Sequence, residues 1–117
     1  MNVTSLANDL QRESQRRKYF VRMEILDQTL NIIKARLYIS PDLFVQVYRN
    51  DRFQTMNFVL LHDGNRLHAR DEVNGRWHKH VHAAPETHDF SADGQRVVTL
   101  YEFLDEVEEI LAGLNLP

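Results

Sequence analysis

Turn signals recur about every ten residues through the middle of the chain, and the segments between them alternate polar and apolar side chains. The turns are Ser40-Pro41-Asp42, Asn50-Asp51, Asp63-Gly64 and Asn74-Gly75. Asn-Gly is the strongest signal, because both central residues of a type I′ hairpin turn need a positive φ. Alternation with a period of two gives a strand one buried and one wet face. The pattern predicts an antiparallel meander of five or six strands, over residues 19–26, 33–40, 43–48, 53–61, 66–73 and 76–82.

Helical periodicity occurs at the two ends of the chain. Residues 3–17 form a weak amphipathic pattern that Thr4 or Ser5 could cap. Thr99 and Glu102 have the spacing of a capping box, and an apolar stripe follows it. The stripe contains Leu100, Phe103, Leu104, Val107, Ile110, Leu111 and Leu114. We therefore expect one α+β domain over residues 1–117, in which the C-terminal amphipathic helix and a weaker N-terminal helix pack on the antiparallel sheet. Residues 83–98 are expected to be a long loop.

Cysteine is absent from the 117 residues, which excludes disulfides, thiolate metal sites and cysteine nucleophiles. The N-terminal segment has no apolar run typical of a signal peptide. No stretch approaches the ~20 apolar residues that a membrane span needs. These features predict a cytoplasmic protein without a membrane partner.

The acidic residues are distributed unevenly. Five of the 17 lie in the last helix, which leaves 12 acidic and 14 basic residues, together with six histidines, in residues 1–98. A mildly basic body with an acidic helix could steer a polyanion toward the sheet. The alternative is that the acidic residues form a solvated helix face.

The segment 66–82 concentrates titratable side chains, with four histidines, four arginines or lysines and two carboxylates. If Asn74-Gly75 is a two-residue turn, Asp71 lies opposite His78 and Ala69 lies opposite His80. Directly opposed side chains have Cβ atoms about 5 Å apart, so Asp71 could orient the His78 ring. His78, His80 and His82 then share one face, while Trp77, Lys79, His68, Arg70 and Glu72 share the other.

The same register raises a difficulty at the preceding turn. Continued through a two-residue Asp63-Gly64 turn, it puts the apolar residues Phe58 and Leu60 on the same face as the three histidines. A bulge at either turn would reverse this relation. The sequence leaves open which face carries the histidines.

Three interpretations of the histidines compete. His78 or His80 could act as a general acid or base on a ribose 2′-hydroxyl, with Arg70 and Lys79 binding the phosphate. Alternating histidines could instead supply two ligands to a metal ion, although three along one straight strand span roughly 13 Å and cannot all reach it. The third interpretation is that they are ordinary strand residues.

The order of these features resembles a known family. Arg70-Asp71, a short turn, His78-Lys79-His80, a loop with proline and an acidic closing helix over residues 101–114 resemble the TumE-type toxins of bacterial and archaeal toxin–antitoxin systems. The resemblance covers about residues 55–114. Arg70 and Asp71 are adjacent here, whereas the family has an aromatic residue between them. The resemblance implies a toxin that acts on RNA and is neutralised by a cognate antitoxin protein.

We therefore hypothesise a small endoribonuclease toxin that needs no metal or cofactor. Its candidate catalytic residues are His78, His80 and Asp71, and its candidate substrate-binding residues are Arg70, Arg76, Trp77 and Lys79. The expected partners are an antitoxin and RNA, and a homodimer is left open. The alternatives are a non-enzymatic protein-interaction module and, third, a histidine metal-binding accessory protein.

Overall fold

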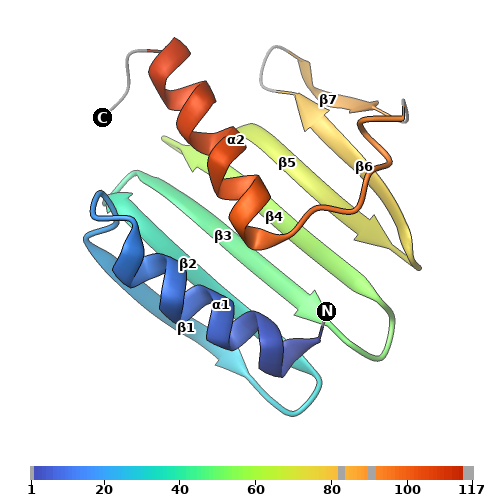
Figure 1. Ribbon diagram of the computed structural model, residues 1–117. Helices are drawn as coiled ribbons and strands as arrows, with labels where there is room; N and C mark the ends of the chain where they lie inside the picture. Colours follow the sequence, from blue (N-terminus) through green and yellow to red (C-terminus); the bar gives the residue numbers. More distant parts are fainter. Residues whose placement is uncertain (1, 82–83, 90–91, 115–117) are drawn as a thin grey trace.

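The α+β class and the antiparallel meander are confirmed by a computed structural model of the chain (Figure 1). The structure describes residues 2–81, 84–89 and 92–114, and for 79–81 and 84–89 it describes the backbone alone. Seven strands pair in chain order: β1 (Arg22–Gln28), β2 (Ile32–Ser40), β3 (Leu43–Asn50), β4 (Thr55–His62), β5 (Asn65–Val73), β6 (Arg76–Val81) and β7 (Ala84–Asp89). The helices are α1 (Val3–Arg16) and α2 (Leu100–Gly113). Residues 83–98 were expected to be a loop, but Ala84–Asp89 form strand β7, because their backbone pairs with β6.

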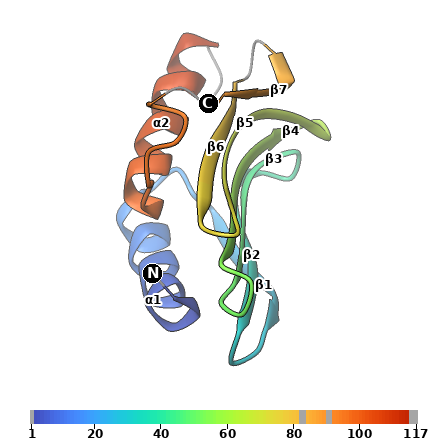
Figure 2. The same cartoon turned by 90° about the vertical axis from the view of Figure 1, so that its right-hand side faces the viewer.

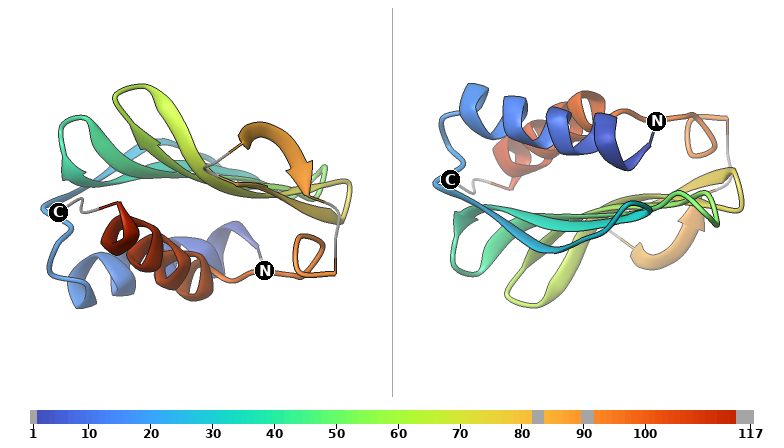
Figure 3. Two further views of the ribbon diagram at one scale, coloured as in Figure 1. Left: turned by 90° about the horizontal axis from the view of Figure 1, so that it is seen from above. Right: turned by 90° about the horizontal axis from the view of Figure 1, so that it is seen from below.

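Both helices lie on one side of the sheet, which we call the helix face (Figure 2). The opposite side, the open face, is covered by neither helix, and β7 curls toward it (Figure 3). Strands β2 to β4 supply the apolar layer under the helices, and α1 and α2 complete the core. From the sheet the core contains Ile33, Ala35, Leu37, Leu43, Val45, Val47, Met56, Phe58 and Leu60, and from the helices Val3, Leu6, Leu10, Leu100, Phe103, Leu104 and Val107.

The two helix starts have reciprocal caps. The predicted box of α2 is confirmed, since Glu102 donates its backbone N–H to Thr99 Oγ1 at 3.1 Å and Thr99 donates to Glu102 Oε1 at 3.0 Å. For α1 the expected caps Thr4 and Ser5 are wrong. Asn2 caps this helix and Ser5 returns the second hydrogen bond. Because a backbone N–H of the first turn is unpaired within the helix, either box fixes the helix start.

The predicted two-residue turns are both present, with positive φ at Asp63, Gly64, Asn74 and Gly75. Between them, β5 contains a bulge. Leu61 pairs with Arg66 while Leu60 pairs with His68, so Leu67 is the extra residue. The extra residue reverses the side-chain alternation of the strand beyond it. Phe58 therefore pairs with Arg70, which puts Arg70 on the helix face and Asp71 on the open face.

Candidate functional site

The hairpin of β5 and β6 brings two of the predicted catalytic residues together on the open face. Asp71 pairs with His78 across the strands, as the two-residue turn predicts. His78 Nε2 lies 3.5 Å from Asp71 Oδ2, and the two side chains are 8% and 15% exposed. A carboxylate beside one ring nitrogen fixes the orientation of an imidazole and stabilises its protonated form. The pair has the arrangement of an acid–base group with its orienting residue.

Asn57 on β4 extends this pair into a three-residue cluster. Its amide Nδ2 donates a hydrogen bond to Asp71 Oδ1, the carboxylate oxygen that does not face His78. Asn57 also lines a cleft of about 530 Å³ on the open face. The cleft is lined by Gln46, Asn57, Val59, Leu61, Gly64, Asn65 and Arg66. Asn57 thus connects the Asp71–His78 pair to an open polar cleft that carries an arginine.

The helix face of the same hairpin is built around Glu106 of α2. Arg70 donates from Nε to Glu106 Oε1 at 3.0 Å and from Nη2 to Glu106 Oε2 at 2.6 Å. His68 Nε2 lies 2.8 Å from the same Oε1, and the His68 ring stacks on Phe103 at 5.4 Å. Arg70 is 2% exposed and also donates to the Asp93 carbonyl at 2.6 Å. This network fastens α2 and the segment before it to the sheet.

The charge of Glu106 follows from these contacts. Burial by itself would raise the pKa of Glu106, but the hydrogen bonds from His68 and Arg70 outweigh it and lower the pKa to about 2. Arg96 adds a further donor, with Nη2 at 3.1 Å from Glu106 Oε2. Glu106 is therefore ionised across the neutral pH range and compensates the buried Arg70 charge.

Trp77 also lies on the helix face, opposite Glu72. It is 5% exposed, and its ring lies 6.3 Å from that of Phe58. It borders a cleft of about 230 Å³ lined by Arg49, Gln54, Glu72, Trp77 and Val97. Within this cleft, Arg49 Nη1 pairs with Glu72 Oε1 at 2.7 Å. Trp77 is thus a residue of the hydrophobic core and packs near Phe58 on the helix face.

The seven predicted site residues are therefore divided between the faces. His78 and Asp71 meet on the open face, and exposed Arg76 pairs with Val73 at the turn on that side. Arg70 and Trp77 lie on the helix face, so they cannot contact a ligand that His78 contacts. Lys79 pairs with Arg70 and His80 pairs with Ala69 in the backbone register. The side chains of Lys79 and His80 fall outside the described residues.

The acidic helix has a structural explanation that the sequence analysis missed. Four of its five acidic residues form ion pairs, with basic partners from three other parts of the chain. Arg17, which follows α1, lies 3.1 Å from Asp105 and 2.9 Å from Glu108. Arg17 also pairs with Glu13 at 2.8 Å, and Glu13 is fully buried. The available signal was the group of basic residues at the end of α1, Arg12, Arg16, Arg17 and Lys18, because charged clusters of opposite sign can pair in the folded chain.

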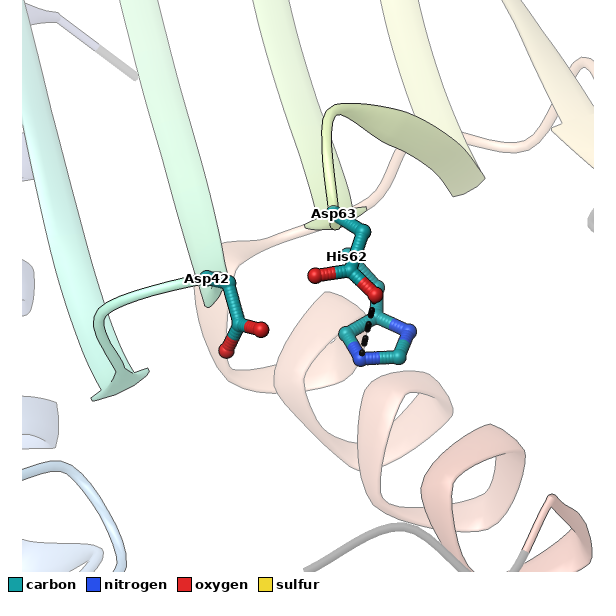
Figure 4. Close-up of side chains that lie close together, drawn as sticks. All are labelled: Asp42, His62 and Asp63. Carbon is teal, nitrogen blue, oxygen red and sulfur yellow. Dashed lines mark ion pairs between the residues drawn. The ribbon is translucent and has the colours of Figure 1, made fainter.

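One group of the described residues has a donor set that could hold a metal ion. Asp42, His62 and Asp63 lie at neighbouring turns, with ligand atoms within 4.8 Å of one another (Figure 4). Both aspartates are exposed. A hydrogen bond with Asp42 raises the pKa of Asp63, whereas hydrogen bonds with Ser40 and Asp63 lower that of Asp42. Exposed acidic groups commonly lie this close without a cation, so the geometry by itself assigns no function.

Comparison with other proteins gives no relative from which to transfer a function. No protein-family model matches the sequence, and searches of curated proteins and of solved structures give no match. Neither helix in the described part of the chain is long and apolar enough to span a membrane. The function must be inferred from the residues of the open face themselves.

Proposed function

We propose that this protein is an endoribonuclease toxin in which His78 acts as the acid–base residue and Asp71 orients it. The observation that carries the proposal is the pairing of His78 Nε2 with Asp71 Oδ2, beside a polar cleft of the open face. An imidazole titrates near neutral pH, which suits it to move a proton in either direction. A reaction built on this pair would need no metal ion.

The chemistry is an intramolecular transesterification, in which the 2′-hydroxyl of a ribose attacks the phosphate on the 3′-oxygen of the same ribose. His78 removes the proton of a 2′-hydroxyl, and the 2′-oxygen forms a bond to phosphorus while the bond to the 5′-oxygen breaks. The leaving 5′-oxygen takes a proton from an acid, for which His80 is the candidate. The products are a 2′,3′-cyclic phosphate and a 5′-hydroxyl. His80 lies two residues beyond His78 in β6, and successive odd or even residues of a strand share a face.

Cations at the edge of the cleft could bind the phosphate. Arg66 lines the cleft and Arg76 is exposed beside the β5–β6 turn. An arginine offers several N–H groups to a phosphate and stabilises the charge that develops on its oxygens. Arg70 has no such role in this proposal, because Glu106 and Asp93 already occupy its guanidinium.

The resemblance to TumE-type toxins adds a biological setting to this chemistry. It implies a cytoplasmic protein that cleaves cellular RNA until a cognate antitoxin protein binds it. No residue of the chain has an established catalytic role in that resemblance, so the assignment of His78 rests on its geometry.

Induced expression tests the proposal. Cells would express the wild type, His78→Ala, Asp71→Asn or the matched control His62→Ala, which removes a histidine from another turn. We expect growth arrest and RNA fragmentation with the wild type and His62→Ala. We expect a loss of roughly 10²-fold or more in cleavage with His78→Ala. Fragments should end in a 2′,3′-cyclic phosphate and form in the presence of a chelator.

Each variant should first be shown to fold by its circular dichroism spectrum and melting temperature. Undiminished cleavage by a folded His78→Ala protein would refute the assignment. If the wild type neither arrests growth nor cuts RNA, the ribonuclease function itself is refuted.

A second candidate function is a non-enzymatic interaction module, and the edge strand β1 favours it. Four of the exposed large apolar residues occur in or beside β1: Val21, Ile25, Leu26 and Leu30. An edge strand with apolar side chains can pair with an extended segment of another chain. Turnover separates the two functions, because an enzyme at trace concentration continues to cut RNA whereas a binding module saturates.

A further inference from the structure

The open face carries a second cluster, away from His78, in which two arginines stack on two aromatic rings. Tyr38 of β2 pairs with Phe44 of β3, and their ring centroids are 5.1 Å apart. The guanidinium carbon of Arg22 lies 4.2 Å from the Tyr38 ring centroid. That of Arg36 lies 4.6 Å from the Phe44 ring centroid. We call these four residues the arginine–aromatic array.

Hydrogen bonds fix the position of Arg36 within the array. Its Nε donates to Gln46 Oε1 at 3.0 Å, and its Nη1 donates to the Tyr38 hydroxyl at 3.2 Å. The Tyr38 hydroxyl in turn donates to Glu24 Oε1 at 3.3 Å. Within the described part of the chain, the Arg36 guanidinium pairs with no carboxylate. Arg36 is therefore a planar cation held in place without a direct ion pair, although Glu24 lies opposite it on β1, whereas Arg70 on the helix face pairs directly with Glu106.

The surrounding charge favours an anionic partner. Followed through the strand register, the described open face carries more basic than acidic residues. The basic ones are Arg22, Lys34, Arg36, Arg66 and Arg76, and the acidic ones are Glu24, Asp27 and Asp71. The acidic residues of α2 lie on the other side of the sheet. This distribution would attract a polyanion to the open face.

We propose that the arginine–aromatic array binds single-stranded RNA, and this inference rests on the proposed ribonuclease function. Unpaired bases stack on aromatic rings and on guanidinium planes, whereas the bases of a duplex are already stacked on each other. The array offers two such planes above a pair of rings. It therefore selects unpaired RNA, while the Asp71–His78 pair performs the cleavage.

The array and the cleavage site form one surface. Gln46 accepts the hydrogen bond from Arg36 and also lines the cleft that Asn57 shares with Asp71. Tyr38 on β2 and Asp71 on β5 are three strands apart and offset by four residues along the strands, which together corresponds to about 19 Å. A strand of RNA several nucleotides long can cross that span. Bases on the array would then belong to the nucleotides that flank the cleaved bond.

The test measures RNA binding in a His78→Ala protein, so that cleavage does not interfere. Fluorescence anisotropy would compare short labelled single-stranded RNA with the same sequence as a duplex, for Arg36→Gln and for a matched control. The control is Arg16→Gln, because Arg16 also stacks on a tyrosine, 4.7 Å from the Tyr101 ring, but belongs to α1. We expect Arg36→Gln to weaken single-strand binding roughly tenfold and Arg16→Gln to change it little.

Three results would overturn the inference. If Arg36→Gln and Arg16→Gln weaken RNA binding equally, net charge alone determines the affinity. If the protein binds duplex RNA as tightly as single-stranded RNA, stacking of unpaired bases on the array is excluded. If Arg36→Gln binds single-stranded RNA as tightly as the protein with Arg36, the array does not contact RNA. This outcome would hold even if the wild type cleaves RNA through His78. If instead Arg36→Gln weakens binding but His78→Ala does not reduce cleavage, the array stands and the assignment of His78 falls.

Discussion

The two faces of the β5–β6 hairpin contain similar residues in different environments. On the helix face, His68 and Arg70 contact the carboxylate of Glu106 beneath α2. On the open face, His78 lies beside the carboxylate of Asp71 with no helix over it. Each face thus has a histidine and a carboxylate in contact. The side chains of the two pairs are similarly buried, and the pairs differ in that a helix covers only the one on the helix face.

The difference shows that residue type by itself does not identify a site. Arg70 has the chemistry of a phosphate ligand, but the buried network with Glu106 and Asp93 uses its donors. Arg36 has the same chemistry, but it is stacked on Phe44 and faces away from the helices. Burial and the presence of a compensating carboxylate separate a structural arginine from a binding one.

The largest effect should come from breaking the helix-face network. Glu106→Ala leaves the Arg70 guanidinium buried without its main partner, and we expect a loss of about 3–5 kcal/mol in the free energy of unfolding. Urea denaturation would measure it. The double variant Arg70→Met, Glu106→Leu should recover part of the loss, because it removes both charges. A loss below about 1 kcal/mol in Glu106→Ala would contradict a structural role for the network.

Low pH should also lower the free energy of unfolding, because protonation of Glu106 removes the charge that compensates Arg70. The pKa of Glu106 is about 2 in the folded protein against 4.5 ordinarily, so this carboxylate contributes stability above pH 4.5 that is lost as the pH falls toward 2. The full contribution is about 3 kcal/mol, of which about 2 kcal/mol should be lost by pH 3. Urea titrations at neutral pH and at pH 3 measure it. Glu106→Gln is the control, and its stability should depend less on pH by that amount.

A smaller effect should distinguish the two histidines. His68→Asn loses the contact with Glu106 and the stacking on Phe103, so we expect it to cost about 2–3 kcal/mol. His78→Asn keeps a polar side chain beside Asp71 and should cost about 1 kcal/mol. RNA cleavage should show the reverse order, with His78→Asn inactive and folded His68→Asn active. Equal stability losses would remove the distinction between the faces.

Much of the fold could be predicted from local patterns. The Asn74-Gly75 and Asp63-Gly64 turns were predicted as two-residue turns, since few dipeptides tolerate two successive positive φ angles. The capping box at Thr99 and the apolar stripe after it defined α2. From the first of these turns the pairing of Asp71 with His78 also followed, because a two-residue turn determines which residues lie opposite each other.

The face that carries each side chain was decided by tertiary structure. A single extra residue, Leu67, moves Arg70 under α2 and Asp71 to the open face. A local sequence window does not contain this information, because either alternation is compatible with the strand and packing against α2 selects one. The partners of the acidic helix were likewise undetermined, since Arg17 and Arg70 reach it from distant parts of the chain. The sequence thus determined strands, turns and opposed pairs, whereas the contacts between sheet and helices decided which charges are buried and which face a ligand.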